Sequence, residues 1–371
     1  MQQNRTLRRL KKSKAAMLSI FFIALMIVLA FLAYVISPDQ TPDANTMNVE
    51  IATQQPGFTC LFFKKYKKNA PEKKHFLHQI LFGQEADAEL IPIRSANIQG
   101  NQIQVAHIID YPLTEWQTYP IEHKLIQQGI ETTMTEKQIY QHYIVKRTFW
   151  LGTDRFGRDM LSRLIIGTRI SLAVGFIAVL ISLWIGVILG SLSAYYGGVT
   201  DMAITWLINV IWAIPTLLLV FAITSVLGKG FWLIFIAVGC TMWVGTARLI
   251  RGQVLSIKEL EYIQVARTMG YSSFRIIFVH ILPNIMGPTV VMAASNFATA
   301  ILIEAGLSFL GIGVQPPVSS WGLMIKENYN FIITNRPMLA IIPGIAIMLM
   351  VLAFNMLGNA LRDALDVKGN V

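Results

Sequence analysis

Ionisable side chains that could do chemistry inside a membrane are nearly absent from the long apolar runs of this sequence. Glu304 is the only acid within or beside the fifth run. An ionisable residue at membrane depth marks a functional hypothesis, although Glu304 lies near the outer end of the run, where a structural role is equally plausible. A membrane-embedded enzyme would need a buried catalytic pair, and an ion-coupled secondary transporter would place charges at the bilayer midplane. Both remain alternatives that the sequence disfavours.

A second set of charges lies just before the second apolar run. Because charges of both signs so close together usually satisfy one another, we expect them to pair, to hold the loop at the headgroups and to make little contact with a solute. The residues are Asp154, Arg155, Arg158, Asp159 and Arg163.

Several kinds of site have no motif here. The sequence lacks a GxxxxGK[ST] phosphate loop, so this chain is not expected to bind ATP. It also lacks HExxH, GxSxG and CxxC, and Cys60 and Cys240 are far apart. His75 and His78 alone are a weak metal signal. We therefore predict a protein that is not an enzyme and holds no metal or cofactor. Many of the basic residues behind the net charge of +10 flank apolar runs, and no nucleic-acid motif accompanies them. They indicate contact with lipids and the orientation of the spans rather than binding of nucleic acid.

The apolar runs define the predicted fold. Of all residues 54% are hydrophobic and 14% charged, against about 25% charged in soluble domains. Crossing a bilayer takes about 17–25 helical residues, and six runs qualify. We expect an all-α polytopic membrane protein with six transmembrane helices at 15–37 and at about 170–195, 203–227, 230–247, 285–305 and 337–358.

The distribution of Lys and Arg predicts the orientation. The basic N-terminus, residues 1–14, and the loop that holds Arg248 to Arg275 belong in the cytoplasm. Residues 361–371 are then cytoplasmic as well (N-in, C-in), and residues 38–168 form an extracytoplasmic insert. Its lysine cluster is typical of a solvated face. Residues 98–105 alternate apolar and polar across Gly100-Asn101, which predicts a β-hairpin.

The cytoplasmic segment 257–284 predicts a helix-turn-helix excursion. Ile257 to Met269 are good helix formers, and Gly270 stands where a helix ends. Ser272 or Ser273 can cap a second short helix. That helix should end near Pro283, which lacks a backbone donor.

This segment resembles the EAA loop of type I ABC importer permeases. The matching positions are Glu261, Ala266, Gly270, Ile277, Leu282 and Pro283, while Val265 replaces a frequent alanine. In that family the short helix lies in a groove on the ATPase subunit, and the small side chain of Ala266 would allow a partner to approach closely. The resemblance implies an ATPase-coupling site made of Glu261, Tyr262, Ala266, Arg267, Gly270, Leu282 and Pro283.

Two more segments resemble the C-type permease of oligopeptide and dipeptide importers. One is the extracytoplasmic motif with Gly152, Thr153, Asp154, Gly157, Arg158 and Asp159; the other is Glu304 to Gly313 followed by Gln315-Pro316-Pro317 and Ser320-Trp321-Gly322. The resemblance covers the first helix and residues 151 to about 366. It does not cover the insert from about 45 to 148.

The resemblance implies an importer in the bacterial cytoplasmic (inner) membrane. Its partners would be a second permease, two ATP-binding subunits that carry ATP and Mg, an extracytoplasmic substrate-binding protein and membrane lipids. The implied solutes are di- and oligopeptides, with nickel or another small solute as the alternative. The insert is expected from its position to contact the binding protein.

Overall fold

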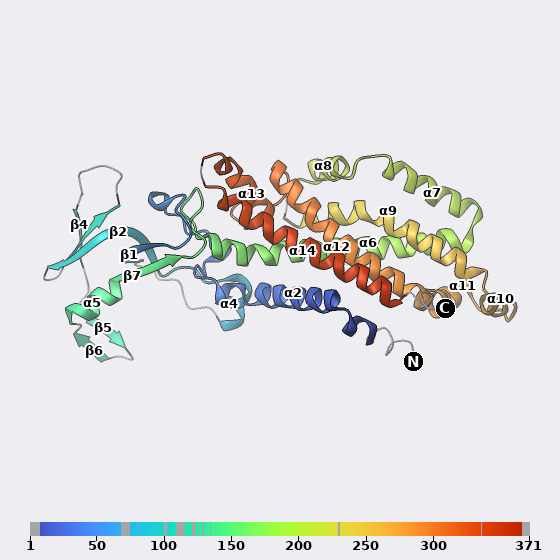
Figure 1. Ribbon diagram of the computed structural model, residues 1–371, viewed down its shortest axis with the longest axis horizontal. Coiled ribbons are helices and arrows are strands. Elements are labelled where there is room, and N and C mark those ends of the chain that lie inside the picture. The colour runs from blue at the N-terminus through green and yellow to red at the C-terminus, as the bar shows by residue number, and fades with distance from the viewer. Residues whose placement is uncertain are drawn as a thin grey trace. The chain divides into compact units, whose positions relative to one another are not determined.

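The computed structural model describes residues 8–67, 75–99, 102–108, 116–120, 124–127, 130–133, 135–228, 231–334 and 336–365. The chain divides into two compact units. The first, which we call the helical unit, comprises residues 1–30, 168–326 and 342–371. The second, the insert unit, comprises residues 31–167 and 327–341. Figure 1 labels the elements of both units.

Apolar helices make up the helical unit. In the described residues five helices are long and apolar enough to cross a membrane, or six spans if one bent pair counts as one. Helix α9 packs against α8 and α12. The helices are α2 (Lys14–Phe31), α6 (Met160–Tyr196), α7 (Gly198–Trp212), α8 (Thr216–Leu227), α9 (Phe231–Lys258), α10 (Glu261–Thr268), α11 (Ser273–Arg275), the π-helical segment η3 (Ile276–Ile281), α12 (Leu282–Leu310), α13 (Trp321–Asn328) and α14 (Met338–Leu365).

The predicted third span, 203–227, is not one straight helix. Helices α7 and α8 meet at an angle of 93°. Pro215 stands directly before α8 with extended backbone (φ −54°, ψ 126°), because a proline in a helix interior would leave a carbonyl without its donor and clash with the preceding turn. Pro215 therefore separates two helices instead of lying inside one, and the pair is either a broken span or a re-entrant loop. Pro343, by contrast, lies inside α14.

Other helices extend beyond their apolar runs. Helix α6 begins at Met160 instead of about 170, and α9 continues to Lys258 instead of ending near 247. Helix α14 reaches Leu365, past the predicted limit of 358. Hydropathy detects only the apolar part of a helix, and these extensions carry charged residues such as Arg163 and Arg362.

Small and polar residues bring three helices together in the helical unit. A Cβ on Gly186 of α6 would lie 2.6 Å from Thr246 Cβ of α9. The amide of Asn296 in α12 donates to Thr246 Oγ1 (3.0 Å) and Ser182 Oγ (3.3 Å). Close backbone approach and hydrogen bonds between helices are the usual stabilising contacts where the solvent is lipid.

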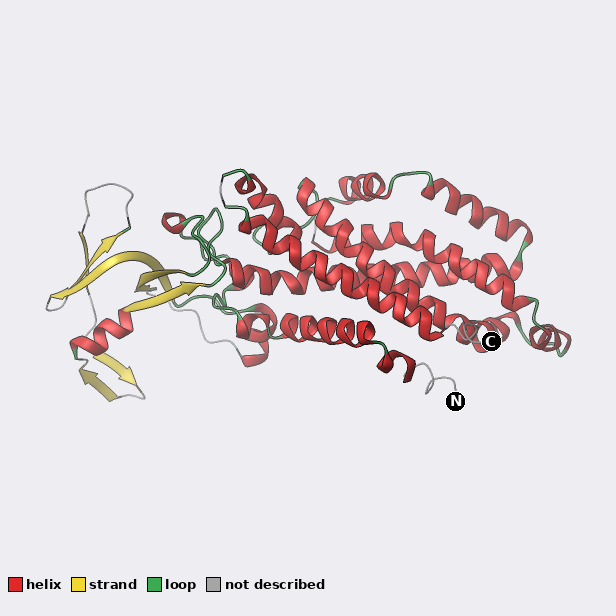
Figure 2. Cartoon of the chain, viewed as in Figure 1, coloured by secondary structure: helices red, strands yellow, loops and turns green. Residues whose placement is uncertain are grey.

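The insert unit is built on antiparallel strands. Its main sheet has the order β4-β3-β2-β1-β7, and β5 and β6 form a separate pair. Figure 2 shows the strands in yellow. The elements are α3 (Ala33–Ile36), the 3₁₀ helices η1 (Pro42–Ala44), η2 (Val49–Ile51) and η4 (Tyr329–Ile332), α4 (Phe76–Phe82), α5 (Glu136–Tyr143), and β1 (Phe58–Tyr66), β2 (Ala88–Gln99), β3 (Gln102–His107), β4 (Trp116–Pro120), β5 (Lys124–Gln127), β6 (Ile130–Thr133) and β7 (Ile144–Phe149).

The predicted hairpin is present. Strands β2 and β3 pair from Gln99–Gln102 outward to Ile93–His107. Its turn, Gly100-Asn101, lies outside the described residues. Both faces of the sheet are covered at β1, because the consecutive residues Phe62 and Phe63 point to opposite faces and are 1% and 2% exposed. The insert therefore contains a core of its own rather than a solvated loop.

Candidate functional site

Helix α10 ends in a glycine turn, as its sequence predicts. Gly270 has φ +78°. Its N–H donates to Arg267 O (3.0 Å), and Tyr271 N–H donates to Ala266 O (3.1 Å). This pair of bonds is the Schellman arrangement, which satisfies the last carbonyls of a helix and requires left-handed backbone. Ser272 then caps the next turn by accepting from Arg275 N–H.

One face of α10 is buried inside the chain. Ile263 is 0% and Ala266 5% exposed. They belong to a cluster, the inner-end cluster, that joins residues of α6, α9, η3 and α12: Ala194, Tyr195, Ile250, Val254, Ile263, Ala266, Ile276, Ile277, Ile281 and Ile285. The small side chain of Ala266 thus permits close packing within the chain. Ala266 is covered by its own chain here, and the approach of a partner to it stays a prediction.

A neighbouring face of α10 is apolar and exposed. Leu260, Tyr262, Val265 and Met269 are 46%, 44%, 54% and 64% exposed. Two charged side chains of the same helix, Glu261 and Arg267, are also exposed. We call these six residues the α10 surface.

Two α10 side chains also bind neighbouring helices. The Tyr262 hydroxyl accepts a hydrogen bond from Asn284 Nδ2 of α12 (3.1 Å). The Arg267 guanidinium lies 4.9 Å from the ring centre of Tyr195 in α6. These contacts hold two residues of the α10 surface against the chain, whereas Leu260, Val265 and Met269 stay exposed.

The helix that follows does not end at Pro283. Residues Ser273–Leu310 form one continuous helical stretch. The π-helical segment Ile276–Ile281 comes immediately before the proline, and Leu282 N–H donates to Ile277 O. A wider π turn relieves the clash between a proline ring and the preceding carbonyls. Asn284 Nδ2 donates to His280 O (2.6 Å). The prediction of a separate short helix is therefore wrong, and Pro283 is exposed.

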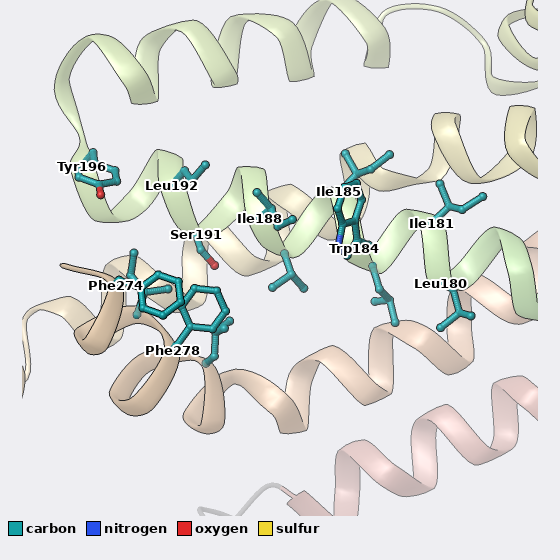
Figure 3. Close-up of a pocket in the computed structure, with 14 residues that line it drawn as sticks. Leu180, Ile181, Trp184, Ile185, Ile188, Ser191, Leu192, Tyr196, Phe274 and Phe278 are labelled. Carbon is teal, nitrogen blue, oxygen red and sulfur yellow. The ribbon is translucent and has the colours of Figure 1, made fainter. Parts of the chain in front are cut away.

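Leu282 borders an open groove. The groove has a volume of about 920 Å³ and lies between α6 and the segment from α11 to α12. Figure 3 shows Trp184 and Ile188 of α6 and Phe274 and Phe278 along it. Its one serine, Ser191, has an Oγ without a hydrogen-bond partner among the described residues. The groove therefore offers almost no polar recognition.

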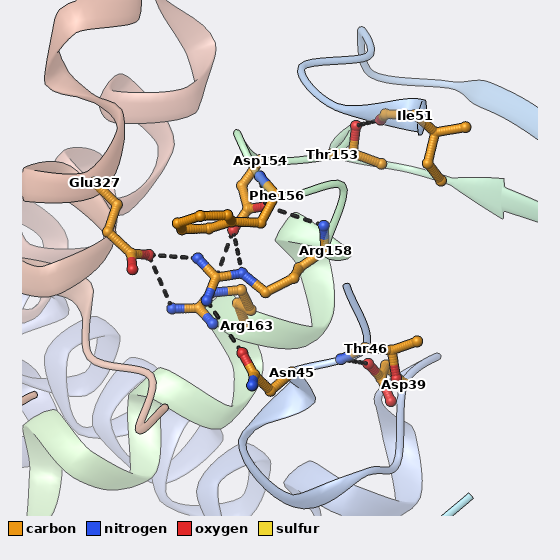
Figure 4. A network of polar contacts seen from close by, with 10 residues as sticks. All are labelled: Asp39, Asn45, Thr46, Ile51, Thr153, Asp154, Phe156, Arg158, Arg163 and Glu327. Atoms are coloured by element: carbon orange, nitrogen blue, oxygen red, sulfur yellow. Dashed lines mark hydrogen bonds and ion pairs between the residues drawn. The ribbon is translucent and has the colours of Figure 1, made fainter. Parts of the chain in front are cut away.

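The extracytoplasmic motif forms a buried ion-pair network. Arg158 Nε lies 2.6 Å from Asp154 Oδ2, and Arg158 Nη2 lies 2.5 Å from Glu327 Oε2. Arg163 Nη2 is 3.2 Å from the same Glu327 oxygen and its Nε is 3.8 Å from Asp154 Oδ2. Figure 4 shows the four side chains together. The expected pairing is present, but its residues are buried within the chain rather than exposed at the headgroups.

The same motif also holds the segment that follows the first span. Thr153 Oγ1 donates to Ile51 O (2.5 Å) and accepts from Gln54 N–H (2.9 Å). Gly152 and Gly157 have φ of +77° and +73°. A Cβ at either would collide with backbone, of Gln54 and Asn48 respectively.

Asp159 and Arg155 stand apart from the ion pairs. Asp159 accepts from the Ser162 N–H (2.8 Å) and hydroxyl at the start of α6, and burial raises the pKa of its carboxyl. Arg155 is exposed and lies 4.3 Å from the ring centre of Phe156. The pairing prediction therefore fails for both residues.

Glu304 is fully buried in α12. Its Oε1 accepts from the Ser308 hydroxyl (2.7 Å). The Ser308 oxygen also accepts from Val314 N–H (3.0 Å) in the turn after the helix. Gly322 of α13 approaches so closely that a Cβ there would lie 2.6 Å from Ala305 Cα. These contacts organise the end of α12, whereas Glu304 Oε2 is buried and has no hydrogen-bond partner among the described residues.

The comparisons with known proteins identify the family. The family described as "Binding-protein-dependent transport system inner membrane component" matches residues 182–368. This chain belongs to that family. The permease also matches the "N-terminal TM domain of oligopeptide transport permease C" at residues 4–56. It is accordingly an ABC-importer permease, a multi-pass protein of the inner membrane and not an enzyme.

Named relatives match the permease over 219 residues, which are 59% of its length and 72% of each relative. They include a dipeptide transport system permease protein of Alkalihalophilus pseudofirmus and a glutathione transport system permease protein of Pectobacterium atrosepticum, each 44% identical. An oligopeptide transport system permease protein of Bacillus subtilis is 42% identical. The solved structure of the MetNI methionine ABC transporter matches 54% of the permease and 97% of its own chain, at 19% identity and a TM-score of 0.43.

Glu327 is the residue of the network that sequence reasoning missed. It lies 164 positions after Arg163 along the chain. The sequence did contain a signal for it. Arg158 and Arg163 carry two positive charges and Asp154 only one negative charge, so one more acid is needed to balance them. Glu327 in α13, only six residues after Trp321 of the recognised motif, was the acid to consider.

Proposed function

We propose that this chain is the permease subunit of an ABC importer that brings peptides into a bacterial cell. In this proposal it pairs with a second permease and two ATP-binding subunits, which hold the ATP and Mg. An extracytoplasmic binding protein delivers the peptide. Residues 1–14, the α10 region and the C-terminus face the cytoplasm.

The coupling role is supported mainly by the contrast between the buried and the exposed residues of α10. Four large apolar side chains are exposed on eight helical residues and their N-cap, while Ile263 and Ala266 on an adjoining face are buried. Exposed apolar patches with a polar rim mark interaction sites. Glu261 and Arg267 at the rim add charges that can orient a partner. We assign the α10 surface to the ATP-binding subunit.

The packing behind α10 supports transmission of movement to the spans. The inner-end cluster joins α10 to the ends of α6, α9 and α12. Packed cores deform little and pass displacement on to their neighbours. The helix from Ser273 to Leu310 is continuous, so a displacement of α10 would reach a spanning helix without an intervening flexible loop.

Peptides are the proposed solutes because the named relatives transport dipeptides, oligopeptides and glutathione. The groove of Figure 3 is not suited to bind a peptide. A peptide needs partners for its charged ends, and small-molecule sites combine apolar walls with a few well-placed polar groups. Apart from the indole N–H of Trp184, only Ser191 and Tyr196 among the described lining residues bring polar side-chain atoms to that groove. The proposal therefore leaves peptide recognition to the pathway between two permeases and to the binding protein.

The test introduces a charge on the α10 surface. Val265→Glu should reduce the amount of ATP-binding subunit that co-purifies by at least tenfold, because the carboxylate would lose water against an apolar partner. The control is Val49→Glu, on a similarly exposed valine of the insert unit (69% exposed). It should leave co-purification unchanged. Equal retention by both variants would overturn the coupling assignment.

The peptide assignment needs a separate measurement. Mass spectrometry of the ligand carried by the co-purifying binding protein should find peptides. A nickel chelate or another solute there would retain the importer and reject peptides as its cargo.

A further inference from the structure

Helix α4 of the insert unit exposes an unusual amount of apolar surface. Its seven residues read FLHQILF, and none is buried. Phe76, Leu77, Leu81 and Phe82 are 64%, 63%, 46% and 60% exposed. Single exposed apolar side chains are ordinary, but four on two turns make an apolar patch that extends around much of the helix. Water is an unfavourable surrounding for such a patch.

Helix α4 is held against the segment that leaves the first span. It packs on α3. At its end Gly83 has φ +74°, and a Cβ there would lie 2.8 Å from Gln40 O and 3.0 Å from the Tyr34 ring. Gln84 N–H then donates to Gln40 O (3.0 Å). These contacts join α4 to residues 34–40.

Chain connectivity places α3 at the outer edge of the bilayer. One residue, Leu32, separates it from α2, whose 18 residues span about 27 Å. The hydrocarbon core is about 30 Å thick. The outward face of α3 is apolar as well, since Val35 and Ile36 are 47% and 46% exposed. Helix α3 therefore begins where the hydrocarbon gives way to headgroups, and the axis of α4, which packs on it, lies within about 8–10 Å of it.

We propose that α4 is an in-plane membrane anchor, with Phe76, Leu77, Leu81 and Phe82 buried among the acyl chains of the outer leaflet. Short amphipathic helices bind in this way at the boundary between headgroups and acyl chains. In the sequence Lys73 and Lys74 directly precede α4, and cations there favour contact with lipid phosphates. The anchor gives the insert an attachment to the membrane besides the spanning helices α2 and α6 that flank it. This inference rests on the membrane location and not on the peptide or ATPase proposals.

The test measures the surroundings of α4 in lipid vesicles. The full chain would carry Cys240→Ala and one new cysteine, Phe82→Cys or Leu77→Cys, bearing a nitroxide label. Burial raises the pKa of the Cys60 thiol to about 11, so Cys60 stays unlabelled at neutral pH. The control is Lys137→Cys on the exposed side of α5. Vesicles would contain phosphatidylethanolamine and phosphatidylglycerol.

Electron paramagnetic resonance then compares collisions with oxygen, which concentrates in lipid, and with a water-soluble nickel chelate. The ratio of oxygen to nickel collisions should be at least fivefold higher for labels on α4 than for the label at position 137. Two labelled positions guard against a local disturbance at either one. An α4 ratio equal to that of the control would place the patch in water and overturn the proposal. Low collision rates with both reagents would place it under protein, which also overturns it.

Discussion

At the scale of residues, the ion-pair network balances its charges within a buried site. Arg158 and Arg163 are 0% exposed and lie between Asp154 and Glu327, which are 0% and 8% exposed. A buried ion pair is not by itself evidence of stability, because taking the charges out of water costs nearly what their attraction gains. Loss of one member has a clearer consequence, since the remaining charge stays buried without its partner.

Glu327→Gln is therefore expected to destabilise the insert unit. It leaves two guanidinium groups facing one carboxylate, and removing one partner of a buried pair costs about 3–5 kcal/mol. The measurement is thermal unfolding in detergent, followed by the reaction of buried Cys60 with a fluorogenic maleimide. Arg155→Gln in the same loop is the control, because Arg155 is exposed and surface charges contribute about 0–1 kcal/mol. Similar unfolding midpoints for both variants would show that the network adds nothing to stability.

At the scale of elements, local patterns predicted some features and missed others. The glycine stop of α10 and the β2–β3 hairpin depend on nearby residues, and both were predicted. The start of α6 at Met160 was not predicted, because Arg163 is tolerated there only through Glu327, far along the chain. Pro283 likewise reads as a helix end, and only the π-helical segment before it makes continuation possible. The exposed face of α10 was predicted as a site, but the inward direction of Ala266 needed the tertiary packing.

Gly270 gives an element-scale prediction about the α10 turn. Its φ of +78° suits glycine, and nothing lies within 4 Å of an added Cβ. Gly270→Val should therefore cost only the left-handed backbone penalty, about 1–2 kcal/mol. Since that cost falls on the end of α10, we expect several-fold less ATP-binding subunit to co-purify, with normal membrane insertion.

The matched control for this turn is Gly270→Asn. Asparagine visits the left-handed region readily, so its co-purification should stay near the wild-type amount. A loss of equal size in both variants would mean that the side chain itself obstructs the partner. The backbone explanation would then be wrong.

At the scale of the whole molecule, the chain combines a transport unit with a second core. The family matches cover residues 4–56 and 182–368, and the sheet of the insert unit lies between them. This sheet has its own apolar cluster, made of Phe63, Ile93, Ile103, Val105, Ile139, Tyr143 and Ile144. The clusters described for the helical unit contain none of these residues. Damage to the sheet should therefore remain local.

Phe63→Ala tests this independence. Phe63 is 2% exposed and stacks near Tyr143 and Tyr119, and truncating a buried phenylalanine costs about 3–5 kcal/mol. Hydrogen exchange should accelerate in β1, β2 and β3 and stay unchanged in α9 and α12, and the ATP-binding subunit should still co-purify. Tyr66→Ala, on a half-exposed residue of the same strand, should change exchange much less. If α9 and α12 also lose protection, the two cores unfold together. If α9 and α12 keep their protection, the same variant also tests the expected contact between the insert and the binding protein. Loss of binding-protein docking in Phe63→Ala would show that the folded sheet forms part of the docking surface.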